Sequence, residues 1–274
     1  MENLRIGLGQ LNTKDNIENS FKEIEKQIEE CTSKEAQLVI FPEMSTYLSE
    51  TSTMEIAQTI DGEIISHFKE LAVKHKIYIH NGSFVEKSKT NGKSYNTSML
   101  INPKGEIETI YRKIHLFDIE LNKELSYRES DRYKRGDSII NHSSPLGDFG
   151  FSICYDLRFP ELYRELTFRG AKLIFVPAAF TMFTGKDHWE SLLRARAIEN
   201  QVYIVAPNQI GEHPDNKLCY GNSMVIDPWG KIIARASDKV GVIVADIDWD
   251  YLEDVRQKLP SLKNRIDLKD MELQ

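Results

Sequence analysis

The sequence is poor in cysteine, with three in 274 residues, at positions 31, 154 and 219. An odd number of cysteines without a Cys-x-x-Cys pair argues against a disulfide framework and against a cysteine-ligated zinc site. The seven histidines include no His-Glu-x-x-His pair, so the best-known local signature of a histidine-bound metal is also missing. We therefore expect free thiols and no resident metal.

Long apolar runs and an excess of positive charge are missing too. No run approaches the ~18 residues that a membrane span needs, and 35 basic against 42 acidic residues give a net charge of −7. A nucleic-acid binder needs a basic surface to neutralise phosphates, so nucleic acid is not an expected partner. Residues 1–5 lack the basic start and apolar stretch of a signal peptide. These absences predict a cytoplasmic protein without a membrane partner.

Motifs that bind nucleotides are incomplete. Gly7 and Gly9 begin like a dinucleotide fingerprint, but Asn12 occupies the position of its third glycine. The phosphate-binding Gly-x-x-x-x-Gly-Lys-Ser/Thr motif and the Gly-x-Ser-x-Gly motif of serine hydrolases do not occur. We therefore expect no organic cofactor.

Short apolar runs alternate with amphipathic segments along the chain, which is typical of an α/β protein. The runs that predict strands are 5–11, 37–41, 77–84, 95–102, 107–111, 150–154, 172–176, 202–206, 223–227 and 241–246. The segments that predict helices are 16–31, capped by Asp15, and 61–75, 160–170, 187–200 and 250–258. No linker rich in Pro, Gly or Ser divides the chain. We predict one domain over 1–274, with a core of about 4–262, a charged tail of about 263–274 and a long surface loop over 121–137.

Cys154 is the first candidate for chemistry. It ends the apolar run 150–154, and a helix is predicted from Pro160 onward. A thiol at such a turn faces ligand, and the positive end of the helix would lower its pKa and stabilise a developing oxyanion. The alternative is a buried cysteine that only packs at the end of the strand.

Glu43 and Lys113 are two further candidates. Glu43 follows the apolar run 38–42, where desolvation would raise its pKa toward neutrality and make it a base for a thiol or for water. Arg112 and Lys113 interrupt the strand pattern of 110–117, so one of the two must point inward. The alternatives are a capping or edge role for Glu43 and a solvated side chain for Lys113.

Together these contexts resemble the nitrilase (carbon–nitrogen hydrolase) superfamily. The resemblance rests on Phe-Pro-Glu ending at Glu43, Tyr-Arg-Lys-Ile-His-Leu-Phe around Lys113, and Ile-Cys-Tyr-Asp-Leu-Arg-Phe-Pro-Glu around Cys154. Further motifs follow in the same order at 177–180, 188–190, 194–200 and 227–230, so the match covers essentially the whole chain.

The resemblance implies a four-layer α-β-β-α sandwich and a catalytic set of Glu43, Lys113 and Cys154. It also implies a second glutamate, for which Glu129 is the natural counterpart and Glu124 the alternative. A solvated loop carboxylate is the other interpretation of Glu129. The members need no metal or organic cofactor, so the resemblance supports the same absence here.

These residue types suit the hydrolysis of a small carboxylic acid amide. The Cys154 thiolate would attack the carbonyl carbon, while Lys113 and a backbone N–H near Tyr155 hold the oxyanion. Glu43 would move the proton, and water would then cleave the thioester. Tyr155, Phe180 and Thr181 are the predicted substrate-binding residues.

The segments that set specificity resemble two kinds of amidase. Residues 111–120 are similar to omega-amidases, which act on 2-oxo dicarboxylic acid monoamides. Residues 179–185, 192–201 and 220–224 are as similar to amidases that act on deaminated glutathione, many of which have His where this chain has Asn222. The alternatives are an N-carbamoyl-amine hydrolase or a nitrilase with the same three residues. A protein without catalytic activity, acting as a scaffold or binding subunit, is a further alternative. Such a protein would be free to lose Glu43, Lys113 and Cys154, and this chain has all three.

The resemblance also implies a homodimer or a higher even oligomer. Two predicted helices carry apolar, aromatic and arginine side chains of the kind found at interfaces. These side chains are Leu162, Tyr163, Leu166 and Phe168 in the first helix, and Trp189, Leu192, Leu193, Arg194 and Arg196 in the second. We expect the first helix, which follows Cys154 closely, to couple assembly to activity.

Overall fold

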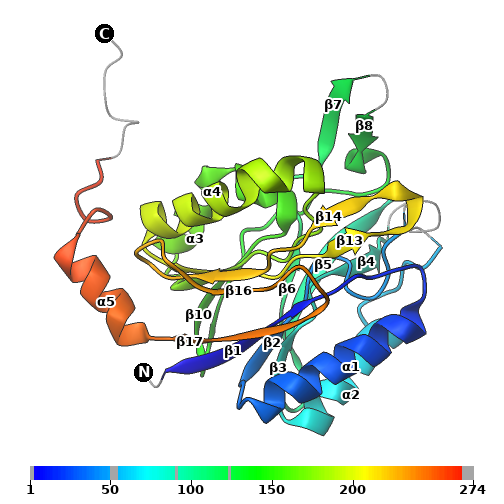
Figure 1. The fold of residues 1–274 in the computed structure, drawn as a ribbon, viewed down its shortest axis with the longest axis horizontal. Helices are drawn as coiled ribbons and strands as arrows, with labels where there is room; N and C mark the ends of the chain where they lie inside the picture. Colours follow the sequence, from blue (N-terminus) through cyan, green and yellow to red (C-terminus); the bar gives the residue numbers. More distant parts are fainter. Residues whose placement is uncertain (1–2, 50–54, 90–91, 123–124, 267–274) are drawn as a thin grey trace.

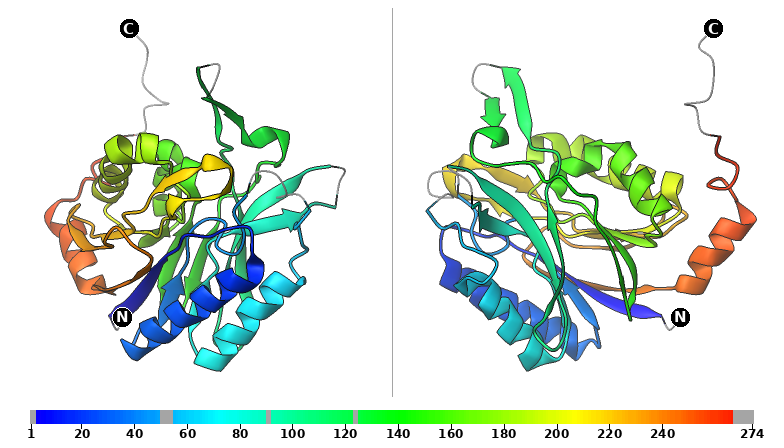
Figure 2. Two further views of the ribbon diagram at one scale, coloured as in Figure 1. Left: turned by 45° about the vertical axis from the view of Figure 1, so that its right-hand side comes forward. Right: turned by 180° about the vertical axis from the view of Figure 1, so that it is seen from behind.

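The computed structural model describes residues 3–49, 55–89, 92–122 and 125–266. Two large sheets lie face to face in the middle of the molecule, and helices cover the outer face of each (Figure 1). The same layers are visible from the other directions in Figure 2. The prediction of a four-layer α-β-β-α sandwich is therefore confirmed. No helix in the described part of the chain combines the length and the apolar character that a membrane crossing needs.

The first sheet has seven described strands in the order β17-β1-β2-β3-β5-β4, with β6 also paired to β5. Their bounds are β1 Leu4–Gln10, β2 Leu38–Ile40, β3 Tyr78–His80, β4 Phe84–Lys87, β5 Ser94–Ile101, β6 Ile107–Arg112 and β17 Gly241–Ile247. β1, β2 and β3 are parallel, whereas β5 is antiparallel to both β3 and β6. The carboxyl ends of β2, β3 and β6 therefore meet at one edge of the sheet.

The second sheet has six described strands in the order β16-β15-β12-β11-β10-β9. Their bounds are β9 Asn141–Ser144, β10 Gly147–Phe151, β11 Leu173–Phe175, β12 Tyr203–Ala206, β15 Met224–Ile226 and β16 Ile232–Arg235. β10, β11 and β12 are parallel, as expected of strands covered on both faces.

Alternating side chains of the central strands explain how three apolar layers form. Leu38 and Ile40 of β2 contact the core between the sheets, while Val39 packs under the outer helices. In the second sheet Phe175 of β11 faces the same central core and Ile174 faces outward. A strand buried on both faces has no polar positions, which is why these runs are continuously apolar.

Two helices cover each sheet, and their apolar stripes complete the outer cores. α1 (Ile17–Ser33) and α2 (Glu63–His75) pack on the first sheet, and α3 (Pro160–Phe168) and α4 (Met182–Asn200) on the second. α5 (Trp249–Lys258) follows β17 and inserts Trp249 and Leu252 into the central core. α4 is longer than predicted because Thr181 caps it, accepting a hydrogen bond from the Thr184 N–H. α1 is capped by Asn16, which accepts from the Asn19 N–H, and not by Asp15 as predicted.

The prediction of a loop over 121–137 is wrong for its first part, whereas 134–137 form no helix or strand. The segment contributes to a hairpin of β7 (Asp118–Asn122) and β8 (Leu125–Arg128), followed by the 3₁₀ turn η1 (Glu129–Asp131). Backbone pairing forms this hairpin without a continuous apolar pattern, so the sequence carries little signal for it. The predicted tail from 263 is described only up to residue 266, and the rest lies outside the described residues.

The prediction that α3 carries spare apolar surface for a partner is wrong for most of its residues. Leu162, Tyr163 and Leu166 are buried in this chain's own core. α3 packs against both the sheet and α4, so it needs a wider apolar face than a helix on a sheet alone. Phe168 is the exception: it is 47% exposed, with the Arg265 guanidinium 4.9 Å from its ring centroid.

Candidate active site

One pocket brings the predicted site residues together at the carboxyl ends of central strands. Glu43 follows β2, Lys113 follows β6 and Cys154 follows β10, and all three line the pocket. β2 and β6 belong to the first sheet and β10 to the second. The pocket therefore lies at the junction of the two sheets. Tyr127 of β8 also lines it, so the β7–β8 hairpin, which Figure 1 shows standing out from the sandwich, is next to the pocket.

The Glu43 carboxylate is buried, and both of its oxygens accept hydrogen bonds. Its Oε1 accepts hydrogen bonds from Lys113 Nζ at 2.9 Å and from Asn96 Nδ2 at 2.7 Å. Its Oε2 accepts from the backbone N–H of Ala179 at 2.9 Å. Because Ala179 follows β11 of the second sheet, Glu43 bridges the two sheets.

Lys113 is the inward-pointing member of the pair predicted from the strand pattern. Its side chain is 2% exposed, and its ammonium lies 2.9 Å from Glu43 Oε1 and 2.9 Å from Glu129 Oε2. Arg112 points the other way and forms a bidentate ion pair with Glu86. One buried ammonium is thus shared by two buried carboxylates.

The charges of this cluster fix its protonation states. Burial alone would lower the pKa of Lys113, but Glu129 and Glu43 raise it well above its usual value. Burial would likewise raise the pKa of Glu43, but Lys113 lowers it below its usual value. The prediction of a near-neutral pKa for Glu43 is therefore wrong, because an ammonium from a strand 70 positions away stabilises the carboxylate.

Cys154 begins the 3₁₀ turn η2 (Cys154–Arg158) in a left-handed conformation, with φ 47°. Burial and the neighbouring Glu43 carboxylate raise the pKa of its thiol well above the usual value. The predicted lowering by a helix end is not found, because the α-helix proper begins only at Pro160. The resting pair is a protonated thiol hydrogen-bonded to an ionised carboxylate, which is the arrangement that a general base requires.

Glu129, the predicted second glutamate, lies beside Lys113. It is buried in η1, directly after β8, and its Oε2 accepts from the Phe117 N–H at 2.6 Å. The solvated loop carboxylate considered for this position is therefore not what the structure contains. Glu124, the alternative, lies outside the described residues.

Asp156 fixes the turn that carries Cys154. Its buried Oδ2 accepts from the Tyr111 hydroxyl at 2.6 Å and from the Ile153 N–H at 2.9 Å. Its Oδ1 accepts from the His115 N–H at 2.9 Å and lies 2.7 Å from His115 Nδ1. Tyr111 and His115 flank Lys113, so one carboxylate ties the segment with the ammonium to the turn with the thiol.

The predicted substrate-binding residues Tyr155, Phe180 and Thr181 all line the pocket. The other lining side chains include several that the sequence analysis did not identify. They are Met44, Tyr47, Leu48, Ser49, Phe117, Tyr127, Tyr133, Arg158, Ala179, Thr184 and Lys217.

Asn96 is a further contact that the sequence analysis missed. It lies on β5 and donates to Glu43, as described above, and more weakly to Glu129 Oε1 at 3.4 Å. The polar residues at 96–98, directly before the apolar residues 99–101 of the same predicted strand, were the available signal. Lys217 had no comparable signal, because it precedes a short strand in a polar stretch.

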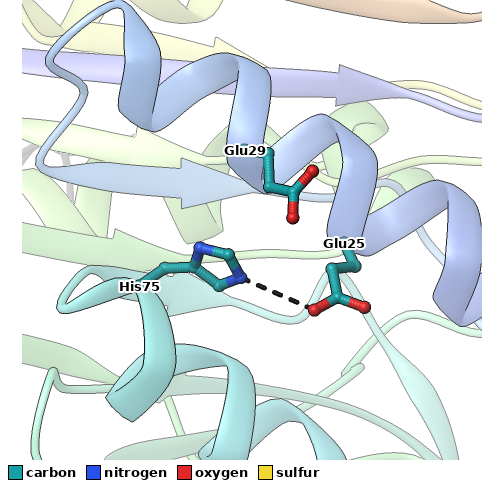
Figure 3. Close-up of side chains that lie close together, drawn as sticks. All are labelled: Glu25, Glu29 and His75. Carbon is teal, nitrogen blue, oxygen red and sulfur yellow. Dashed lines mark ion pairs between the residues drawn. The ribbon is translucent and has the colours of Figure 1, made fainter.

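A group of possible metal ligands lies on the outer helices (Figure 3). Glu25 and Glu29 of α1 and His75 of α2 have ligand atoms within 4.8 Å of one another. Glu25 already has a cationic partner, since Lys74 Nζ lies 2.6 Å from its Oε1. The cluster belongs to the layer that covers the first sheet and takes no part in the pocket.

The two-sheet sandwich thus carries a pocket that brings together a thiol, two carboxylates and an ammonium. The family model described as carbon–nitrogen hydrolase matches residues 5–257. The chain belongs to the carbon–nitrogen hydrolase family, as the resemblance in its sequence predicted.

Relatives with known names agree with this assignment. The chain is 41% identical over 261 residues to the deaminated glutathione amidase of Synechocystis sp. (strain PCC 6803), covering 94% of this chain and 96% of that protein. It is 39% identical over 271 residues to the deaminated glutathione amidase of Dictyostelium discoideum, covering 95% and 93%.

Two solved structures share the fold. The C. elegans NitFhit protein superposes with a TM-score of 0.90 at 36% identity, covering 96% of this chain and 65% of that longer one. Saccharomyces cerevisiae Nit3, described as a member of branch 10 of the nitrilase superfamily, superposes with a TM-score of 0.86 at 30% identity, covering 94% and 95%.

Proposed function

We propose that this amidase hydrolyses a small carboxylic acid amide through a thioester on Cys154. One observation carries the proposal: the Cys154 thiol lies against the ionised Glu43 carboxylate, which in turn contacts the buried Lys113 ammonium. The names of the relatives support deaminated glutathione as the substrate. The similarity of residues 111–120 to omega-amidases supports 2-oxo dicarboxylic acid monoamides.

In the first half-reaction Glu43 accepts the proton of the Cys154 thiol, and the thiolate attacks the amide carbonyl carbon. The Lys113 ammonium and the backbone N–H of Tyr155 stabilise the oxyanion that forms. Glu43 then gives its proton to the departing nitrogen, and the carbon–nitrogen bond breaks. The amine or ammonia leaves, and the acyl group remains on the sulfur.

In the second half-reaction water cleaves the thioester. Glu43 accepts a proton from the attacking water, and the carbon–sulfur bond breaks as the acid forms and the thiol regains its proton. Glu43 returns this proton to the sulfur, so it is protonated twice and deprotonated twice in each cycle. Glu129 holds the Lys113 ammonium from the other side, so Lys113 keeps a carboxylate partner while Glu43 is protonated.

A substrate panel tests the proposal. Purified protein is expected to release acid together with ammonia or amine from 2-oxoglutaramate and deaminated glutathione, measured by chromatography of both products. N-carbamoyl amines and simple nitriles are expected to react far more slowly. If the protein hydrolyses only carbamoyl amines or only nitriles, it is an N-carbamoyl-amine hydrolase or a nitrilase and not an amidase of this substrate class. If it hydrolyses none of the compounds, a binding protein is favoured.

We also propose that residues 1–274 form one domain that assembles into a homodimer in the cytoplasm. The family match over 5–257 supports one domain, and three free thiols are typical of a reducing compartment. Phe168 of α3 and Ile198 of α4 support an interface, because both are large, apolar and about half exposed.

Light scattering tests the assembly. At micromolar concentration the wild type is expected to have about twice the 31.6 kDa chain mass, or an even multiple of it. A Phe168→Glu, Ile198→Glu variant is expected to shift toward the monomer, because burying two carboxylates in an apolar interface is unfavourable. A fully active wild-type monomer would contradict both the interface and its coupling to activity.

A further inference from the structure

The pocket contains two cationic side chains besides Lys113. They are Arg158, in η2, and Lys217, between the turn η3 (Pro214–Asn216) and β14 (Leu218–Tyr220). Within residues 3–49, 55–89, 92–122 and 125–266, neither forms an ion pair with a carboxylate.

Arg158 already has other neighbours. Both of its terminal nitrogens lie 3.4 Å from His188 Nδ1, and its guanidinium lies 5.3 Å from the ring centroid of Phe180 and 5.9 Å from that of Tyr155. Lys217 makes no side-chain hydrogen bond among the described residues, so its three N–H donors are available to a ligand.

The segment around Lys217 is fixed against the pocket wall on both sides. Tyr220 N donates to Phe180 O at 2.9 Å, and Cys219 pairs with Thr181 in an antiparallel bridge. On the other side Ser49 Oγ donates to Asp215 Oδ2 at 3.1 Å. The ammonium is therefore carried by an anchored hairpin.

Lys217 is charged where it lies. Burial alone would lower its pKa, but nearby Cys219, Tyr127 and Glu43 raise it above its usual value. These neighbours outweigh the loss of hydration, so the side chain is an ammonium, yet none of its N–H groups has a hydrogen-bond partner among the described residues. An anionic ligand would accept hydrogen bonds from them.

We propose that Lys217 binds a carboxylate on the acyl part of the substrate, so that the pocket selects monoamides of dicarboxylic acids. The assignment rests on the proposed amidase function and deepens it. Glu43 and Glu129 together carry one more charge than Lys113 neutralises, and they repel an anionic substrate. Lys217 offsets this repulsion and orients the acyl chain so that its other end meets Cys154.

The test compares two amides that differ only at the distal end. Glutaramate has a carboxylate there, and pentanamide has the same chain with a methyl group. Lys217→Met is expected to lower kcat/KM for glutaramate by roughly 10- to 100-fold, mainly through KM, as for loss of one charge-assisted hydrogen bond. The kcat/KM for pentanamide is expected to stay within about twofold.

Two further variants control the experiment. Lys217→Arg keeps the charge and is expected to retain most of the activity on glutaramate. Lys104→Met removes an exposed lysine in the turn after β5 and is expected to change neither substrate. Thermal unfolding of each variant checks that the fold is intact, which we expect because Lys217 has no side-chain hydrogen bond to lose.

Three outcomes would overturn the assignment. Equal losses on both amides would mean that Lys217 stabilises the reacting centre and not a distal carboxylate. Unchanged kinetics on both amides would mean that Lys217 does not contact the substrate. A wild-type enzyme that hydrolyses neither of these amides nor any amide of the substrate panel would instead overturn the proposed amidase function, and the assignment of Lys217 with it.

Discussion

Cys154→Ala is expected to lower kcat by about four to six orders of magnitude, because the variant has no atom that can form the thioester. The fold should survive, since the change removes one sulfur from a pocket wall and disturbs no backbone hydrogen bond. The measurement is single-turnover and steady-state product release on the best amide, with circular dichroism for the fold. Activity above a trace would mean that the nucleophile is another residue.

Cys31→Ala is the matched control for this experiment. Cys31 lies on the buried face of α1 and does not line the pocket, so its loss should leave most activity. Cys219 is a poorer control. It is buried in β14 and packs with Met44 and Ala179, which line the pocket.

Lys113→Met is expected to have the second-largest effect, lowering kcat by about two to three orders of magnitude through loss of an oxyanion donor. It should also destabilise the protein by about 3–5 kcal/mol, because it leaves two buried carboxylates without their cation. The pKa of Glu43 then rises, since burial is no longer opposed, and its fraction of active base falls at neutral pH. Steady-state kinetics and urea unfolding measure the two effects. A variant with only a raised KM would make Lys113 a substrate-binding group.

A second variant separates stability from chemistry. Lys113→Met combined with Glu129→Gln removes one positive and one negative charge, so it should recover much of the lost stability. It should not recover kcat, because the oxyanion donor is still absent. Recovery of both would show that Lys113 acts only by holding the fold together.

The sequence predicted the site where local pattern and chemistry coincide. Glu43 and Cys154 each follow an apolar strand, and Lys113 breaks the pattern of another, so each stands out against its neighbours. Lys217 lines the same pocket from a polar stretch, where another polar residue carries no information, and Asn96 contacts Glu43 from a strand of the first sheet. Their positions depend on pairing between distant segments, which no local pattern encodes.

The directions predicted for the pKa values of Glu43 and Cys154 were wrong for the same reason. Burial of Glu43 could be read from its position after an apolar run, but its neutralisation by Lys113 depends on the packing of β2 and β6 into one sheet. Fold prediction was more successful, because continuous apolar strands and one-sided helices require layers on both faces. The short polar strands β7 and β8 were not predicted, because the backbone hydrogen bonds that stabilise them do not depend on a particular side-chain pattern.

The thiol belongs to one sheet, whereas its base and the ammonium belong to the other. A slip of one sheet past the other by a single residue, about 3.3 Å, would leave every strand pairing within each sheet intact yet part Cys154 from Glu43. The apolar side chains between the sheets therefore hold Cys154 and Glu43 in register. We expect substitutions in that central core to lower kcat even though they do not contact the substrate.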